Sequence, residues 1–268
     1  MQSVKRVRVE HLAGGVATIV LDYPPLNLTT MAIMRDLERA VMDVAEDDAV
    51  RVVIITAAGE RAFCVGSDIN EFPQISDNFV EKKLRRENAV FTRIEAMPKP
   101  VIAAINGMAL GGGCELALAC DFRTMDERTK IGMPEIKLGT FPGSGGVFRL
   151  PKLIGQAKAM ELLCLGNPLT AQDALALGMI TRIAPAGKAL DVAIALANEL
   201  ATRAIFAIGC IKKAVQAAPL QTVAEATQMS LEMSEQVFKT ADCAEGTAAF
   251  LEKRKPRFVG APSTQESS

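Results

Sequence analysis

The chain of 268 residues is predicted to fold as an α/β protein with a helical C-terminal region. Short β-branched runs alternate with stretches of helical periodicity before Gln156, which indicates strands covered by helices. After Gln156, Ala-rich and Leu-rich helical periodicity dominates. Hydrophobic residues make up 49% of the chain and charged residues 23%, so a globular fold is expected rather than a disordered or fibrous one.

The N-terminal elements follow from alternation and turn residues. Valines alternate with charged residues at 7–9, and an apolar run covers 16–21, so two strands joined at 14–15 are expected to form a hairpin. Thr29 or Thr30 can cap the next helix, in which apolar residues recur every three or four positions.

The middle of the chain repeats a unit of strand, loop and helix. Val52 to Thr56 and Val101 to Ile105 are short apolar runs, typical of strands buried on both faces. A charged helical stretch around Phe79 to Glu95 separates them. A third unit has a helix from Cys114 to Cys120 and a strand from Asp121 to Met125.

The C-terminal third contains one predicted strand, Met179 to Ala184, and four predicted helices. The helices lie near Gly187 to Arg203, Phe206 to Ala217, Leu220 to Lys239 and Glu245 to Lys255. We divide the chain into a core of residues 1–195, a helical region of residues 196–260 and a polar tail of residues 261–268 that is expected to be disordered.

Charge and composition exclude several classes of partner. The formal net charge is −1, and the 30 basic residues form no tract that could follow a phosphate backbone. With 11 Phe, 1 Tyr and no Trp there is little material for stacking bases, so no nucleic-acid partner is expected. The six cysteines form no C-x-x-C pair and the chain has one histidine, so no metal site is expected and buried free thiols are favoured.

The expected location is the cytoplasm. The N-terminal residues carry charges among alternating valines and lack the apolar run of a signal peptide. No apolar stretch reaches about 18 residues without a charge or a breaker, so no contact with a membrane is expected.

Two glycine-rich segments, 63–68 and 106–115, each follow a predicted buried strand. Glycines let the backbone approach a ligand closely, and the second segment ends at a helix N-terminus, whose dipole favours negative charge. Unpaired amides from the two segments could therefore converge on one oxygen atom. The dinucleotide fingerprint G-x-G-x-x-G fails, since its last glycine would fall at Leu116. The structural alternative is that the glycines serve only turns and helix packing.

Glu115 and Glu135 are candidate acid–base residues. Glu115 begins an apolar helical run, and Glu135 follows Pro134 in a loop with few other charges. Taken alone, they could be a first-turn glutamate favoured by the helix dipole and a loop salt bridge. Two carboxylates in apolar surroundings can instead differ in pKa, with one protonated and one ionised, as acid–base chemistry requires.

These segments resemble the crotonase family of enoyl-coenzyme A hydratases and isomerases. The resemblance is carried by Arg61 to Asp68, Asn106 to Asp121, Met133 to Gly146 and Glu245 to Arg257. It implies a spiral of ββα units followed by a helical region that serves oligomerisation, assembled as a homotrimer or a dimer of trimers.

Roles in the site come from the same resemblance. The backbone amides of Ser67 and Gly112 would form an oxyanion hole for the thioester carbonyl oxygen. Glu135 would protonate C2, and Glu115 would orient and help activate the water. Other residues are expected to bind the substrate or its coenzyme A moiety: Cys64, Val65, Gly66, Asp68, Ile69, Asn70, Gly111, Phe250 and Lys253.

Two positions depart from the family pattern. Ser67 stands where many hydratases have alanine, so its hydroxyl could contact substrate while its amide still donates. Asn70 stands where hydratases often carry a lysine near the coenzyme phosphates. Both departures bear on acyl specificity and on affinity for coenzyme A.

The resemblance implies an enoyl-CoA hydratase that needs no cofactor, because coenzyme A arrives as part of the acyl-CoA thioester substrate. Another reaction on the same scaffold is the first alternative: isomerisation, dienoyl-CoA hydration, decarboxylation or thioester hydrolysis. A non-catalytic RNA-binding or scaffold homologue is the second, and the presence of both Glu115 and Glu135 speaks against it.

Overall fold

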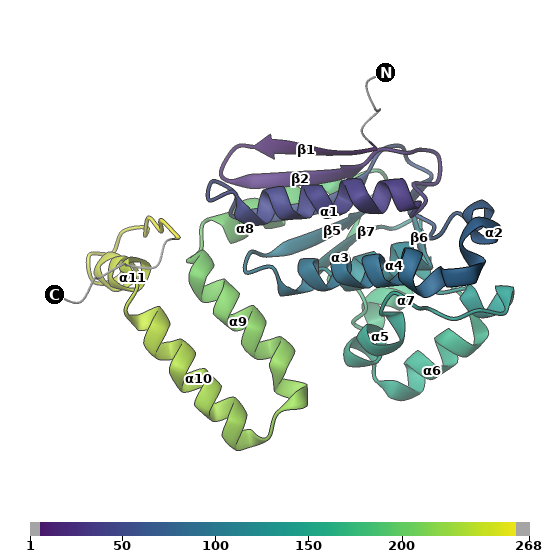
Figure 1. The fold of residues 1–268 in the computed structure, drawn as a ribbon. Helices are drawn as coiled ribbons and strands as arrows, with labels where there is room; N and C mark the ends of the chain where they lie inside the picture. Colours follow the sequence, from purple (N-terminus) through teal and green to yellow (C-terminus); the bar gives the residue numbers. More distant parts are fainter. Residues whose placement is uncertain (1–5, 261–268) are drawn as a thin grey trace.

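The main sheet contains six strands in the order β1-β2-β3-β5-β7-β10. The computed structural model describes residues 6–260 (Figure 1). The strands are β1 (Val7–Leu12), β2 (Val16–Leu21), β3 (Val52–Ala57), β5 (Val101–Ile105), β7 (Phe122–Asp126) and β10 (Arg182–Ala184). β1 and β2 form the predicted antiparallel hairpin, and every later pairing is parallel.

Helices cover both faces of this sheet. α1 (Met31–Glu46) and α3 (Arg85–Ala96) pack on one face, and α8 (Ala189–Ala201) packs on the other (Figure 1). Buried apolar side chains therefore form two clusters, one on each side, as a parallel sheet requires. Thr30 caps α1, since its hydroxyl accepts a hydrogen bond of 3.1 Å from the Ile33 amide.

A second, smaller sheet has the strand order β4-β6-β8-β9. Its strands are β4 (Ala62–Cys64), β6 (Met108–Leu110), β8 (Lys130–Gly132) and β9 (Leu169–Thr170). β4, β6 and β8 run parallel, so the segments that follow them leave the same edge of the sheet. α4 (Gly112–Leu118) starts at this edge and lies so close to β4 that a Cβ atom on Gly113 would overlap the Cys64 carbonyl oxygen.

Several short helices surround the small sheet. They are η1 (Ile69–Glu71), α2 (Phe72–Ile75), η2 (Ser76–Asn78), the π-helical turn η3 (Val80–Leu84), η4 (Glu135–Leu138), α5 (Gly146–Ile154), α6 (Gln156–Leu165) and α7 (Ala171–Ala176). η3 runs directly into α3. The helical stretch predicted around 79–95 is thus one continuous segment with an irregular first turn.

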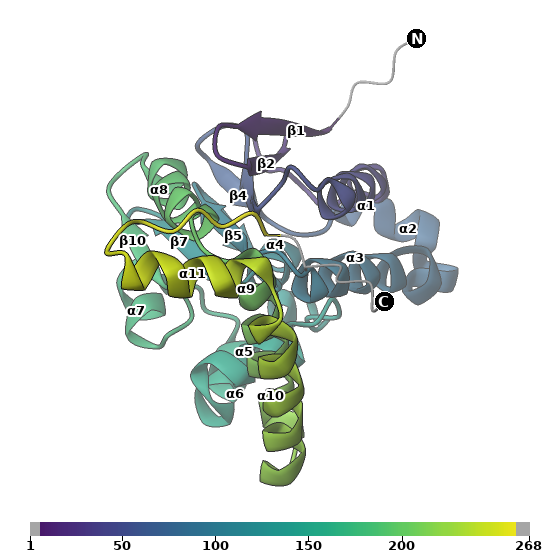
Figure 2. The same cartoon turned by 90° about the vertical axis from the view of Figure 1, so that its left-hand side faces the viewer.

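The last helices form an arm that extends away from the body (Figures 1 and 2). The arm consists of α9 (Ile205–Ala217), η5 (Ala218–Leu220), α10 (Val223–Phe238) and α11 (Ala241–Leu251). α10 has no buried residue, although its first turn carries a complete capping box between Thr222 and Glu225.

Some predicted boundaries need correction. β10 begins at Arg182 rather than at 179, and α11 spans Ala241–Leu251 rather than 245–255. The reason for the second error is the N-cap: the Thr240 hydroxyl accepts from the Cys243 amide at 3.1 Å and starts the helix four residues early. The predicted core boundary at 195 falls inside α8, and the tail of residues 261–268 lies outside the described residues.

Two further findings concern helices and thiols. Within residues 6–260, no single helix is long and apolar enough to cross a membrane; α8 and the segment Ile205–Leu220 reach that length and composition only as a pair, which is bent by 109°.

All six cysteines are free, but only three are buried. Cys164 is exposed, which corrects the expectation that all six are buried.

Candidate active site

The two glycine-rich segments meet at the edge of the small sheet. Gly66 follows β4, and Gly111 and Gly112 follow the neighbouring parallel strand β6. A Cβ atom on Gly66 would lie 3.1 Å from the Gly112 amide nitrogen and 3.5 Å from the Gly111 Cα. Gly66 has φ of +85° and Gly111 has φ of +55°, which non-glycine residues rarely adopt, so both close approach and backbone conformation favour glycine here.

The backbone amides of Ser67 and Gly112 have no hydrogen-bond acceptor among residues 6–260. Gly112 is the first residue of α4, where amides lack an acceptor inside the helix. Neighbouring groups are fixed: the Gly111 amide donates to the Gly132 carbonyl at 3.0 Å, and the Gly66 carbonyl accepts from the Thr29 amide at 2.8 Å. The structure thus brings two unpaired donors together on held loops, as oxyanion stabilisation requires.

Glu115 lies in the first turn of α4 with only 3% of its surface exposed. Its Oε1 atom accepts hydrogen bonds of 2.8 Å from the amides of Ser144 and Gly146. Burial raises the pKa of Glu115 to about 8; the Gly146 amide opposes the increase, and the charge of Glu135 adds to it. The side chain is therefore a carboxyl group that can gain and lose a proton near neutral pH.

Glu135 begins η4 in the loop after β8. Its Oε1 atom lies 3.1 Å from the position that a Cβ atom on Gly111 would occupy, which places the carboxyl beside the second glycine segment. Its Oε2 atom is buried and has no hydrogen-bond partner in the part of the chain that the structure describes. Burial raises the pKa of Glu135 and so favours its protonated form.

Sequence reasoning missed a buried polar cluster behind Glu115. Lys83, Glu87 and Ser144 are each no more than 2% exposed. Nζ of Lys83 lies 3.0 Å from Oε1 of Glu87, and the Ser144 hydroxyl donates to Oε2 of Glu87 at 2.5 Å. The available signal was the Lys-x-x-x-Glu spacing, which usually marks a solvated pair on a helix surface.

The expected substrate-binding residues around Ser67 lie in one continuous segment. Cys64 ends β4, and burial raises the pKa of its thiol to about 12, so the sulfur stays protonated. Asp68 caps η1: its Oδ1 accepts from the amide of Asn70 at 3.0 Å and from its side chain at 2.8 Å. The Asn70 side chain is therefore directed at Asp68, and Ile69 between them is exposed.

The structure does not bring Phe250 or Lys253 to this segment within one chain. Phe250, in α11, is 82% exposed and lies in the arm, at the end of the molecule away from α4 and α2 (Figure 1). Lys253 lies beyond the end of α11 with φ of +54°, which corrects its expected place inside the helix.

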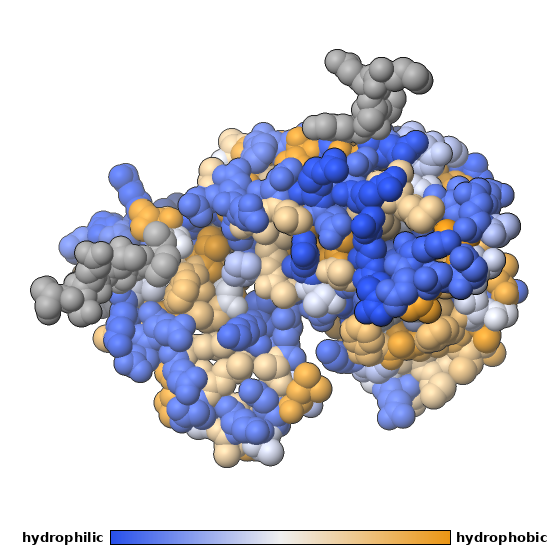
Figure 3. All heavy atoms as spheres, in the orientation of Figure 1, coloured by the Kyte–Doolittle hydropathy of each residue, from blue (hydrophilic) through white to orange (hydrophobic). Residues whose placement is uncertain are grey.

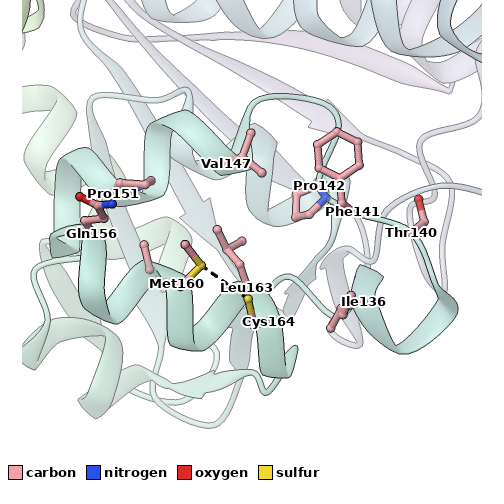
Figure 4. Close-up of a pocket in the computed structure, with 11 residues that line it drawn as sticks. Ile136, Thr140, Phe141, Pro142, Val147, Pro151, Gln156, Met160, Leu163 and Cys164 are labelled. Carbon is pink, nitrogen blue, oxygen red and sulfur yellow. Dashed lines mark hydrogen bonds between the residues drawn. The ribbon is translucent and has the colours of Figure 1, made fainter.

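An apolar groove of about 460 Å³ lies beside the loop that carries Glu135 (Figure 4). Ile136 and Thr140 from this loop form one wall, and α5 and α6 form the other. The further lining residues are Phe141, Pro142, Val147, Pro151, Gln156, Ala159, Met160, Leu163 and Cys164.

Among the described residues, His, Cys, Asp and Glu side chains form no group of three or more that could hold a metal ion. The groups that this site presents are backbone amides and carboxyl groups. Two donors can stabilise an oxyanion, and two carboxyls can exchange protons with whatever lies between them.

Comparison with known proteins shows the family of this chain. Residues 11–261 match the family model for Enoyl-CoA hydratase/isomerase. A probable enoyl-CoA hydratase of Bacillus subtilis is 36% identical over 91% of this chain and 95% of that protein. A crotonyl-CoA hydratase of Syntrophomonas wolfei is 35% identical over 91% of this chain and 94% of that protein.

A solved structure gives the same result for the fold. The crystal structure of an enoyl-CoA hydratase from Bacillus anthracis superposes with a TM-score of 0.92 at 35% identity, covering 96% of this chain and all of that one. The predicted spiral α/β core with a helical C-terminal region is thereby confirmed. The chain belongs to the enoyl-CoA hydratase/isomerase family, that is, to the crotonases.

Proposed function

We propose that this protein is an enoyl-CoA hydratase, which adds water across the 2,3 double bond of an enoyl-CoA thioester. The observation that carries the proposal is the meeting of two unpaired amides, Ser67 and Gly112, with the buried carboxyl of Glu115 and the half-buried carboxyl of Glu135. Relatives with 33–38% identity over most of the chain are named as hydratases, and this supports it.

The amides of Ser67 and Gly112 supply the electrostatic part of catalysis. When water attacks C3, the π electrons of the double bond move towards the carbonyl, and negative charge develops on the thioester oxygen. Two donors that are already held in place stabilise this enolate without reorganisation. Loss of one such donor typically raises a barrier by about 2.7–4 kcal/mol.

The two glutamates carry the protons. Glu115 accepts one proton from the attacking water, whose oxygen bonds to C3, and Glu135 gives its proton to C2 as the enolate collapses. The thioester product contains the oxygen and one hydrogen of the water together with the proton from Glu135, and the proton left on Glu115 is returned to Glu135 through solvent before the next turnover.

The environment of the pair supports these roles. Nearby carboxylates cannot both ionise easily, so one of them tends to keep a proton. Two amides bind Oε1 of Glu115 and stabilise its ionised form, although burial still holds its pKa at about 8, whereas Oε2 of Glu135 has no donor among the described residues. Once Glu115 has lost its proton, this asymmetry favours Glu115 as the base and Glu135 as the acid.

Hydration is favoured over other reactions of the family because this chain has both glutamates. An isomerase that moves a proton along an acyl chain can work with one carboxyl group, whereas water addition needs an acceptor and a donor. Ser67 and Asn70 remain the positions where acyl specificity and coenzyme A affinity would differ from those of other hydratases.

The test is loss of the conjugated enoyl absorbance with crotonyl-CoA and longer enoyl-CoA thioesters. Wild type should consume the substrate, and Glu115→Gln and Glu135→Gln should each slow it by about 10²–10⁴-fold. Glu127→Gln, an exposed glutamate outside the site, is the matched control and should retain full activity. A folded wild type that turns over none of these substrates would exclude the hydratase proposal.

The assembly and location of the protein are parts of the same proposal. Apolar side chains are exposed on the arm and over α5 and α6, where the space-filling view shows orange and tan residues among blue ones (Figure 3). A homotrimer or a dimer of trimers would cover them and would allow Phe250 and Lys253 to reach the ligand of a neighbouring subunit. We also propose that the protein works in the cytoplasm, with no nucleic-acid or membrane partner and no metal or redox cofactor.

A further inference from the structure

Lys83 and Glu87 form an ion pair that is almost completely enclosed, with exposed fractions of 2% and 1%. Nζ of Lys83 lies 3.0 Å from Oε1 of Glu87 and also donates to the carbonyl oxygen of Thr29. Removing two charges from water costs several kcal/mol per ion, so a buried pair is weak evidence for a stabilising role. Its place beside two catalytic loops points to a local role instead.

One end of the pair is connected to Glu115. Oε2 of Glu87 accepts from the Ser144 hydroxyl at 2.5 Å, and the Ser144 amide donates to Oε1 of Glu115 at 2.8 Å. The next residue on α3, Asn88, donates from its side chain to the Gly143 carbonyl at 2.8 Å. α3 therefore holds the loop that in turn holds Glu115.

The other end of the pair is connected to the first glycine segment. Lys83 donates to the carbonyl of Thr29, and the amide of the same Thr29 donates to the Gly66 carbonyl at 2.8 Å. The pair thus lies between the segment that presents the Ser67 amide and the loop that orients Glu115.

We propose that Glu87, paired with Lys83, is a positioning residue for Glu115: it fixes the loop whose amides orient this carboxyl, and its charge acts on the carboxyl across Ser144. This inference deepens the proposed function and rests on it for the role of Glu115 in turnover. Glu87 touches no reacting atom, so it acts only through Ser144 and through its field.

The charges around Glu115 come from several elements. Burial is the main cause of its raised pKa, and the charges of Glu135 in η4 and Glu87 in α3 raise it further. Lys83 in η3 offsets the charge of Glu87. Removing the charge of Glu87 should therefore lower the pKa of Glu115, and removing the charge of Lys83 should raise it.

Arginines also lie near, but each has its own partners. Arg149 in α5 donates to the Ser144 carbonyl at 3.2 Å and pairs with Glu95 at 2.7 Å. Arg123 in β7 donates to backbone carbonyls, including that of Met179 at 2.7 Å. Among the described residues, no hydrogen bond or ion pair joins either arginine to Glu87 or Lys83.

The test compares pH profiles of kcat/KM for hydration. Glu87→Gln keeps an acceptor for Ser144 and the side-chain volume but removes the negative charge, so the acidic limb should move down by about one pH unit. Lys83→Met leaves the charge of Glu87 without its counterion, so the limb should move up. A role limited to holding the fold would lower rate or stability without opposite shifts.

The matched control is Glu81→Gln. Like Glu87, Glu81 forms an ion pair with a basic residue four positions away, here Arg85, but this pair is exposed on the surface. Substitution of Glu81 should leave the acidic limb of the pH profile where it is in wild type. If Lys83→Met does not fold, the contrast between Glu87→Gln and Glu81→Gln decides the question.

A readout without turnover separates this inference from the proposed function. An infrared titration of the Glu115 carboxyl, taken as the difference between wild type and Glu115→Gln, should show the same downward shift in the Glu87→Gln background. Turnover with no shift would overturn the role of Glu87 and leave the hydratase standing. A shift without hydration of any enoyl-CoA would support Glu87 and exclude the hydratase.

Discussion

Glu115, in the first turn of α4, and Glu135, in the loop after β8, meet at one site but are held in different ways. Glu115 is enclosed by helix α4 and by the loop at 143–146, and two amides bind one of its oxygens. Glu135 lies half-buried at the start of a short 3₁₀ helix, with one oxygen unpartnered among the described residues. The comparison teaches that two carboxyl groups whose pKa values are both raised by burial can still differ in the donors that hold them.

The largest expected effect is in a proton-exchange reaction that needs only one of the two glutamates, and it tests whether Glu115 and Glu135 have separate roles. A saturated thioester such as butyryl-CoA can lose and regain a C2 proton through the enolate, with no water added. In D₂O, Glu135→Gln should slow this exchange by about 10²–10⁴-fold, whereas Glu115→Gln should slow it far less. Nuclear magnetic resonance of the C2 protons measures it. Equal losses in both variants would contradict separate roles.

The second prediction concerns stability and pH. The pKa of Glu115 is about 8 in the folded protein, well above that of an unfolded glutamate. Between the two values the unfolded chain releases a proton that the folded protein keeps, so stability falls as pH rises from about 4.5 to about 8. Glu115→Gln should remove a loss on the order of 4 kcal/mol. Denaturant unfolding at pH 5 and pH 9 tests this, and parallel behaviour of wild type and variant would refute it.

The third prediction compares Gly146, whose amide binds Glu115, with Gly139, which ends the short helix that Glu135 begins. A Cβ atom on Gly146 would overlap Met133 Sδ and lie 3.2 Å from Oε1 of Glu115, whereas one on Gly139 would have no neighbour within 4 Å. Gly146→Ala should therefore cost about 1–3 kcal/mol and reduce turnover. Gly139→Ala should cost about 1 kcal/mol, from its φ of +71° alone, and keep turnover. Thermal unfolding and rate assays compare the two variants. If Gly146→Ala changed neither stability nor turnover, the loop would be able to shift and accommodate the added methyl group.

The smallest predicted effect is on the pH dependence of kcat/KM in the wild-type protein. If Glu115 must be ionised to accept a proton, kcat/KM should fall by about fivefold between pH 8 and pH 7, following an apparent pKa near 8. Stopped-flow hydration of crotonyl-CoA over this range measures it. A flat profile from pH 6 to 9 would assign the base role to a group other than Glu115.

The larger elements of the fold were predictable because their patterns are long. Val101–Ile105 is a strand over the predicted residues, and the hairpin at the N-terminus forms as expected. The small sheet was not predicted, because β4, β6 and β8 have three residues each and periodicity needs more. Strand order likewise depends on contacts that a linear pattern does not contain.

For the site, the residue types were predictable and their supporting contacts were not. The glycine segments and both glutamates follow from sequence and resemblance, and the structure brings them together. The link from Glu87 to Glu115 through Ser144 joins residues 57 and 29 positions apart, a relation that only the folded chain displays. A lysine and a glutamate four residues apart usually indicate an exposed pair on a helix surface, yet Lys83 and Glu87 are buried.

The donors at the meeting point of the two glycine segments belong to the main chain, and this has an evolutionary consequence. Exchange of a side chain at Ser67 leaves its amide in place, so ordinary substitutions cannot delete this donor, which we propose to stabilise the enolate. Carboxyls such as Glu115 can be gained or lost one at a time around a constant centre. Descendants of such a scaffold can therefore change which bond is made or broken while keeping their affinity for the same charged intermediate.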